Sequence, residues 1–338
     1  MVISFSKQKI AFSVPLFLVV SVLFTSSPVS AEHFRIEKSN TIIDPSGRTL
    51  TIDRPFERII SLYGAHTENL FALGLDKEII GISRNTDYPP EALKNSLYSY
   101  HDDPEKFIAA RPDLVLIRPM IDRGYPQLIT RLEKMGINVV SLQPGNIDEM
   151  YTYWYILGIL TGRRHAASEM IRHFKSAVLE FKSLTETVEK PKRVYFEAIH
   201  SKMKTFSQGS MAIFALETAG GINIAHDSEP VRGTNIAAYG KERILSHAYD
   251  IDVYLAQSGT MNHPTLSLIK NESGFRVIKA IRDNQIYFID EMIVSRPTFR
   301  LLYGIYEIGR ILYPDIFGPA AAEILTKAKS YRSLSLKD

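Results

Sequence analysis

The sequence predicts an α/β fold with two lobes, each built on a parallel sheet, that are bridged by one long α-helix. Short apolar strands alternate with short helices along residues 57–146, and the same order returns along residues 191–317. This alternation is typical of parallel sheets covered by helices, so we expect both lobes to be Rossmann-like. Between them, Arg163 to Glu189 is the longest uninterrupted helical pattern in the chain.

The bridging helix is predicted from its apolar spacing. Apolar residues recur every three or four positions from Ala166 to Val188, which gives one apolar stripe along a helix. Gly162 precedes the pattern and Pro191 follows it, as expected at helix ends. At 1.5 Å per residue the helix spans roughly 40 Å, about the diameter of a domain. A helix of this length can join two bodies as well as pack on one.

These patterns divide the chain into six parts. We predict a signal peptide that is removed (1–31), an N-terminal β-hairpin extension (32–56), an N-terminal α/β lobe (57–146), a helical region (147–190) that contains the interlobe helix (163–189), a C-terminal α/β lobe (191–317) and a peripheral tail (318–338).

The elements of the first part follow from apolar runs and turn residues. Asp44-Pro45-Ser46-Gly47 predicts the hairpin turn of the extension, at the edge of the first lobe. In the lobe we expect strands at 58–62, 78–82, 114–117 and 139–142, and helices at 67–73, 104–110 and 125–135. Gly74 and Gly136 end two of these helices.

The second part repeats this order. We expect strands at 193–199, 251–256 and 286–289, helices at 211–219, 241–247 and 298–313, and short helical segments at 267–269 and 276–280. Each half also contains a glutamate eight positions before an aspartate that precedes a strand, Glu105 with Asp113 and Glu242 with Asp250. A divergent internal duplication explains this match, and two similar lobes facing each other form a cleft.

The N-terminus has the features of a cleavable secretory signal. Lys7 and Lys9 form a basic start, residues 10–24 are apolar, and Val29-Ser30-Ala31 offers a cleavage point after Ala31. A membrane anchor is the alternative, but about 15 apolar residues broken by Pro15 fall short of the roughly 20 that span a bilayer. We therefore expect a soluble protein of a bacterial periplasm.

Composition excludes several classes of partner and chemistry. Without the signal the net charge is close to +1, which gives no support for a nucleic-acid partner. The chain has no cysteine, so it forms no disulfide and carries no lipid-modified N-terminal cysteine. It also lacks a Gly-x-Ser-x-Gly nucleophile motif and a phosphate-binding glycine loop, so we expect no enzymatic activity and no intrinsic cofactor.

The candidate ligand-binding residues lie on loops at the carboxyl ends of the predicted strands, where open parallel sheets meet their ligands. We predict a site formed by Tyr63, His66, Arg84, Tyr100, His101, Arg118, His200, Arg232, His263 and Arg296. These side chains suit a large, partly anionic, aromatic or metal-bearing ligand. No histidine pair has the i, i+4 spacing of a zinc site, and His66 and His263 are weak candidates for direct metal ligation.

Glu105 and Glu242 are candidate docking residues. Each lies in the first turn of a short helix, where the helix dipole alone favours a carboxylate. Their equivalent places on two duplicated lobes suit a partner that is itself a twofold dimer.

The sequence resembles the periplasmic solute-binding proteins of ABC importers for ferric siderophores, cobalamin and haem, over about residues 41–317. The motifs that carry the resemblance are Asp44-Pro45-Ser46-Gly47-Arg48 within 41–54, Arg58 to Leu62 leading to Thr67-Glu68 and Ala72-Leu73-Gly74, Gly81-Ile82-Ser83 with Tyr88-Pro89, Arg111-Pro112-Asp113-Leu114-Val115 within 105–116, Gly220-Gly221-Ile222-Asn223, and Ser295-Arg296-Pro297.

The resemblance implies two lobes on one rigid helix, a shallow cleft with limited hinge motion, and no catalysis. It implies that Glu105 and Glu242 bind arginines of a dimeric permease in the inner membrane. Some cobalamin binders of this family place a tryptophan before the first glutamate helix, where this chain has Tyr100-His101. That difference leaves siderophore, haem and other chelates open, and the only tryptophan, Trp154, lies in the helical region.

The sequence therefore predicts a monomeric periplasmic protein that captures a metal chelate, with an iron complex favoured, and delivers it to an ABC permease. Three alternatives remain at this point: capture of a bare metal ion or small oxyanion, a secreted α/β hydrolase, and an adaptor without a small ligand. Bare-cation capture needs three or four His and carboxylate ligands in one place, and a hydrolase needs a nucleophile beside a base.

Overall fold

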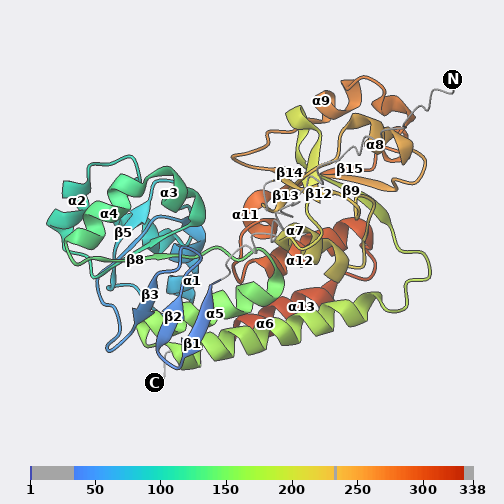
Figure 1. Cartoon of the computed structure of the whole chain (residues 1–338). Helices are drawn as coiled ribbons and strands as arrows, with labels where there is room; N and C mark the ends of the chain where they lie inside the picture. The colour runs from blue at the N-terminus through green and yellow to red at the C-terminus, as the bar shows by residue number, and fades with distance from the viewer. Residues whose placement is uncertain (2–33, 232–233, 331–338) are drawn as a thin grey trace. The chain divides into compact units, whose positions relative to one another are not determined.

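The computed structural model describes Met1 and residues 34–231 and 234–330 (Figure 1). The predicted signal peptide, apart from Met1, lies outside the described residues, as do Arg232 and the last eight residues. No helix in the described ranges has the length and apolar character that crossing a membrane requires.

A five-stranded parallel sheet forms the first lobe. Its order is β6 (Ser96–Tyr98), β5 (Ile79–Ser83), β4 (Ile59–Ser61), β7 (Leu114–Ile117) and β8 (Asn138–Ser141). The central strands β4 and β7 are buried along their whole length, which explains their unbroken apolar sequences. The connecting helices are α1 (Gly64–Ala72), α2 (Pro104–Ala110), α3 (Pro119–Gly124) and α4 (Pro126–Lys134), with a short 3₁₀ turn η1 (Pro90–Lys94).

The second lobe contains a seven-stranded mixed sheet. Its parallel part consists of β9 (Arg193–Ile199), β14 (Val253–Ser258), β15 (Ile286–Asp290) and the short β11 (Ile222–Asn223). An antiparallel part continues from β9 through β10 (Lys204–Phe206), β13 (Ile236–Ala238) and β12 (Glu229–Pro230). The predicted fold class is confirmed, and the antiparallel part, which we name the β-arm (β10, β12 and β13), is an addition that the sequence did not reveal.

Short helices surround the second sheet. They are the 3₁₀ turns η2 (His200–Lys202) and η4 (Phe275–Val277) and the helices α7 (Met211–Thr218), α8 (Lys241–Ser246), α9 (Leu266–Asn271), α10 (Lys279–Arg282), α11 (Glu291–Val294) and α12 (Leu301–Leu312). The strand predicted at 251–256 is β14, which begins two residues later than predicted because residues 251–252 belong to the connection from α8.

The N-terminal extension forms its own three-stranded antiparallel sheet, of β1 (Arg35–Lys38), β2 (Thr41–Ile43) and β3 (Thr49–Thr51). The hairpin turn lies where Asp44-Pro45-Ser46-Gly47 predicted it, because the Asp44 carboxylate accepts hydrogen bonds from the backbone N–H groups of Ser46 and Arg48, both at 3.0 Å. The strands of the extension do not pair with the five-stranded sheet. An Arg48–Asp122 hydrogen bond of 3.0 Å fastens it to α3 instead.

The helical region contains two helices, α5 (Ile147–Thr161) and α6 (Arg164–Thr185). They are separated at Gly162, which adopts the left-handed conformation with φ of 71°. The helix α6 ends at Thr185 instead of Glu189, because a turn closed by Val188 N–H and the Thr185 carbonyl follows it on the approach to Pro191.

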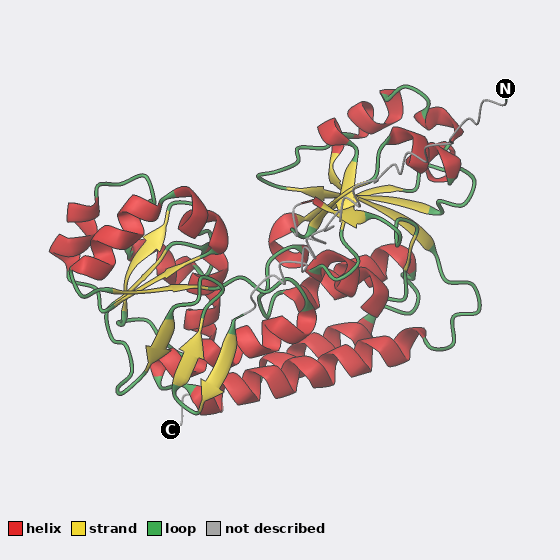
Figure 2. Cartoon of the chain, viewed as in Figure 1, coloured by secondary structure: helices red, strands yellow, loops and turns green. Residues whose placement is uncertain are grey.

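The chain beyond Phe317 is not wholly peripheral, which corrects our expectation for the tail. Helix α13 (Pro319–Lys329) lies along α6 (Figures 1 and 2) and buries four side chains, Ala321, Ile324, Leu325 and Ala328. Because α6 packs on α5, α12 and α13, it is one member of a helical layer and not a free rod. One buried core runs through this layer from Trp154 and Phe174 to Ile305 and Phe317.

A short segment before α12 joins the second lobe to the first, and we name it the junction (residues 295–300). The Pro297 carbonyl accepts hydrogen bonds from the Trp154 indole at 3.1 Å and the Asn69 amide at 3.0 Å. The Arg300 guanidinium binds the Glu68 carboxylate with two hydrogen bonds of 2.8 and 2.7 Å. The Glu68 side chain is only 4% exposed, so water contributes little to stabilising its charge. Among the described residues, Arg300 is the cation that compensates this charge.

Removing Arg300 should therefore destabilise the protein strongly. We expect Arg300→Met to lower the free energy of unfolding by about 3 kcal/mol, because a buried carboxylate loses its partner. Adding Glu68→Gln in the same chain should recover part of that loss. Chemical denaturation of wild type, both single variants and the double variant measures the coupling, and strictly additive losses would contradict this role of the ion pair.

Candidate ligand-binding site

A cavity of about 350 Å³ is lined by loops of both sheets. Its first wall consists of Tyr63, Asn85, Arg118 and Gln143, which follow β4, β5, β7 and β8 in turn. All four strands are parallel, so their carboxyl ends meet at one edge of the sheet. The cavity therefore lies where the strand order predicts a ligand site.

The second wall mixes polar and apolar side chains. Residues after β14 and β15 contribute Thr260, Met261, Glu291, Ser295 and Arg296. The β-arm and the start of α7 add Phe206, Ser210, Met211 and residues 234–236. An apolar wall beside a few polar groups is the usual make-up of a small-molecule site.

Tyr63 and Arg118 form a stacked pair on the first wall. The Arg118 guanidinium lies 4.8 Å from the centre of the Tyr63 ring, an arrangement with cation–π attraction. Burial raises the pKa of Tyr63, and the charges of Arg118 and Arg296 only partly oppose this shift, so the phenol stays protonated at neutral pH. In the described part of the chain Arg118 has no ion-pair partner, so its charge is available to a ligand.

Arg296 lines the same cavity but is already engaged. Its guanidinium donates to the Asp87 carboxylate at 3.0 Å and to the Asn85 carbonyl at 3.4 Å, across the junction. It also packs on Gly64, where a side chain would lie 2.7 Å from the guanidinium. Arg296 thus contributes a largely compensated charge to the cavity.

A smaller hollow of about 180 Å³ adjoins the cavity through Asn85 and Arg118. Arg84 and Tyr100 line this hollow and not the main cavity. Next to it, the Tyr100 ring packs 4.4 Å from His101 and 4.7 Å from Tyr125, measured between ring centroids. The structure therefore places three predicted site residues, Arg84, Tyr100 and His101, beside the main cavity instead of in it.

His66 is not a cavity residue, which corrects the expectation that it lies on a cleft loop. It lies in the first turn of α1 and is fully buried. Its Nε2 donates to the Ile117 carbonyl at 3.0 Å, so Nδ1 accepts from the Tyr153 hydroxyl at 2.7 Å. With both ring nitrogens used inside the core, His66 has no lone pair for a metal ion.

His200 is also buried, in a polar cluster beneath the second sheet. Its Nδ1 lies 2.7 Å from the Glu197 carboxylate, which also accepts from Asn262 at 2.9 Å and from Tyr254. The hydrogen bond to Glu197 is the main cause of a raised pKa of His200. His200 does not line the cavity, and we assign it a structural role in this buried polar cluster.

The other predicted residues give no metal site. His263 is exposed and lines neither cavity, and Arg232 lies outside the described residues. Within residues 34–231 and 234–330, no three His, Asp or Glu side chains lie close enough together to hold a metal ion. The ligand set that bare-cation capture requires is therefore missing from this part of the chain.

Several cavity residues were missed by sequence reasoning. Gln143 follows β8, so it lies at the carboxyl end of a parallel strand, where a ligand site is expected. Its position was therefore a signal that could have identified it. Glu291 and Ser295 belong to a segment that follows a predicted strand in the same way. They were missed because only tyrosine, histidine and arginine side chains were chosen as candidate ligand-binding residues. Phe206 and Ile236 belong to the β-arm, whose strands of two or three residues carry no clear periodicity.

The two candidate docking glutamates lie in equivalent helices but differ in their surroundings. Glu105 lies in the first turn of α2, where the Asp103 side chain accepts a hydrogen bond from its backbone N–H at 2.9 Å, and its carboxylate pairs with Arg131 at 2.7 Å. Glu242 lies in the first turn of α8 and is exposed, and no ion pair involves it in the described ranges. Both carboxylates are accessible to a partner.

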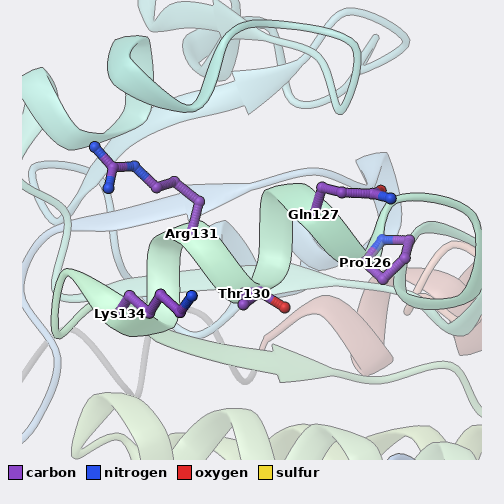
Figure 3. Close-up of a pocket in the computed structure, with 5 residues that line it drawn as sticks. All are labelled: Pro126, Gln127, Thr130, Arg131 and Lys134. Atoms are coloured by element: carbon purple, nitrogen blue, oxygen red, sulfur yellow. The ribbon is translucent and has the colours of Figure 1, made fainter.

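A separate hollow of about 460 Å³ borders the first of these glutamates. Figure 3 shows its lining side chains, which all belong to one face of α4 and include Arg131 and Lys134. Because one exposed helix supplies every lining residue, this hollow belongs to the surface around Glu105 and not to the ligand cavity.

The fold and cavity define a two-lobed binding protein, and comparison with known proteins gives its family. The family model described as "Periplasmic binding protein" matches residues 59–292. The chain belongs to this family of ABC-transporter substrate-binding proteins, as the sequence motifs indicated. Members of the family are transport binding proteins and not enzymes.

Individual relatives agree with this assignment. The chain is 26% identical over 287 residues to an uncharacterized ABC transporter substrate-binding lipoprotein of Bacillus subtilis, covering 82% of this chain and 86% of that protein. It is 23% identical over 257 residues to a vitamin B12-binding protein of Vibrio cholerae, covering 75% and 88%. A possible iron-binding periplasmic solute-binding protein from Staphylococcus epidermidis has a similar structure, with a TM-score of 0.68, 26% identity and coverage of 77% and 100%.

The burial of neutral His66 predicts a pH-dependent stability. Burial lowers the pKa of His66 from its ordinary value of 6.5 to about 4, so the unfolded chain binds this proton more readily than the folded protein does. The stability that this group contributes is complete above pH 6.5 and is lost as the pH falls toward 4. The total loss is roughly 3 kcal/mol.

A histidine exchange tests this sign. We expect His66→Gln to flatten the acid side of the stability curve between pH 6.5 and 4, whereas His263→Gln, at an exposed histidine, should leave the slope unchanged. Denaturant titrations at several pH values measure both slopes. Equal slopes for wild type and His66→Gln would show that His66 is not held neutral.

Proposed function

We propose that this protein is an exported, monomeric solute-binding protein that captures a metal chelate of the ferric siderophore, haem or cobalamin type and delivers it to an ABC permease dimer in the inner membrane. The chelate is cargo, and the protein carries no cofactor of its own. The cavity between the two sheets is the observation on which the proposal rests, because Arg118 has no ion-pair partner among the described residues and the second wall offers apolar side chains beside polar ones.

The make-up of the cavity supports a chelate over the alternatives. A ligand with an apolar surface can pack on Phe206, Met211 and Ile236, while a carboxylate or another acceptor binds Arg118. A bare cation finds no converging ligand set in the described residues. Relatives described as binding vitamin B12 and, in one case, possibly iron point to the same class of cargo.

Arg118 is the best single test of ligand binding. We expect Arg118→Gln to weaken binding of an anionic chelate such as haem by more than tenfold, or about 1.4 kcal/mol, because the cavity loses its free positive charge. Arg123→Gln, on the exposed face of helix α3 that follows Arg118, is the matched control and should bind like wild type. Fluorescence titration with haem, cobalamin and ferric hydroxamates measures the affinities, and equal affinity of the Arg118 variant would remove this residue from the site.

Delivery to a permease is the second part of the proposal. Glu105 and Glu242 each lie in the first turn of a short helix on a different lobe, and both carboxylates reach solvent. Arginines of a dimeric membrane partner can pair with both at once if the lobes keep a fixed separation. Such pairing uses surfaces outside the ligand cavity.

The docking glutamates can be separated from ligand binding by mutation. We expect the double variant Glu105→Ala/Glu242→Ala to bind ligand with unchanged affinity but to support no uptake in cells that depend on this protein, because neither lobe can pair with the permease. The double variant Glu91→Ala/Glu323→Ala removes two other exposed carboxylates and should transport normally. Loss of ligand affinity in the first variant, or normal uptake by it, would count against docking.

A further inference from the structure

The main cavity contains a buried carboxylate that the proposed function does not use. Glu291 is the first residue of α11, lines the cavity and is only 8% exposed. Its Oε2 accepts one hydrogen bond, from the Met261 backbone N–H at 3.3 Å. Within the described residues no side chain donates to Glu291 and no cation pairs with it.

The chain is shaped to keep this carboxylate at the cavity wall. The turn at residues 258–262 wraps around it, closed by a backbone bridge between Gly259 and Asn262. A Cβ at position 259 would lie 2.2 Å from the Glu291 side-chain carbons, so any residue other than glycine there displaces Glu291. The close approach and the Met261 N–H together fix the side chain.

The charges that line the cavity then take a simple pattern. Among the described residues that line it, Arg118 and Arg296 are the positive ones and Glu291 is the negative one. Asp87 compensates Arg296 at 3.0 Å, which leaves one free positive charge on the first wall and one free negative charge on the second. A cavity with this polarity favours a ligand whose two faces have opposite character.

We propose that Glu291 is a specificity-determining residue, which selects chelates that present a protonated amine or another strong hydrogen-bond donor to the second wall and rejects those that present a carboxylate there. This inference rests on the proposed function. Its physical basis is that a buried carboxylate loses hydration when a ligand fills the cavity. A ligand that donates to it restores that interaction, whereas an anionic group adds repulsion.

Three matched ligands isolate this effect. Ferrioxamine B is a linear ferric trihydroxamate that ends in a protonated amine. Acetylation of that amine removes the charge, and succinylation replaces it by a carboxylate, while the iron centre stays the same. We expect wild type to bind the amine form at least tenfold more tightly than the succinylated form, with the acetylated form between them.

Two variants connect the preference to the carboxylate. Glu291→Gln keeps size and shape, and Gly259→Ala displaces the carboxylate while keeping the glutamate, so both should reduce the preference to threefold or less. Asp283→Asn, at an exposed carboxylate outside the cavity, should keep the wild-type preference. Thermal melting of each variant establishes that it is folded.

The outcomes separate this inference from the proposed function. If wild type binds these chelates or haem and cobalamin, but Glu291→Gln has the same order of affinities, Glu291 does not select ligands and the proposed function stands. A wild type that binds the succinylated chelate as tightly as the amine chelate would also overturn the inference alone. If none of the five ligands binds, the proposed function fails and the inference fails with it.

Discussion

The buried ion pair between Glu68 and Arg300 is the interaction on which the arrangement of the lobes depends. It joins α1 of the first lobe to the start of α12, next to the Pro297 carbonyl, which accepts hydrogen bonds from Asn69 of the first lobe and Trp154 of α5. A pair this deeply buried contributes little net stability compared with apolar residues, but breaking it is costly. Its main effect is therefore to fix geometry.

The same junction builds the ligand cavity, because Ser295 and Arg296 immediately precede the residues that lock the lobes together. A wide hinge opening would have to separate Arg300 from Glu68, Arg296 from Asp87 and Pro297 from its two donors. The continuous core of α5, α6, α12 and α13 opposes the same motion. The cavity is thus largely formed before a ligand enters, which favours ligands that match the fixed positions of Arg118 and Glu291.

Sequence alone predicted the elements that local patterns determine and missed those that depend on packing. The bounds of α2, β7 and β9 agree with prediction, since each is a short segment rich in apolar residues between clear turn or breaker residues. The first wall of the cavity follows from strand order, so Tyr63 and Arg118 were predictable. The inward direction of His66 was not, because its partner Tyr153 lies 87 positions away in the sequence.

The duplicated glutamates show how two lobes of similar sequence acquire different electrostatics. Glu105 pairs with Arg131, whereas Glu242 forms no ion pair in the described ranges, since its neighbours Lys241 and Arg243 pair with Glu272 and Asp227. The Glu105–Arg131 pair is about half exposed, and such surface pairs are worth at most about 1 kcal/mol. A permease arginine can therefore replace Arg131 at small cost, but it must also meet the positive charges of Arg131 and Lys134 on α4. In docking of the proposed kind, Glu242 on the second lobe consequently attracts a permease arginine more strongly than Glu105 does. The contact at Glu105 on the first lobe then depends more on shape complementarity than on charge.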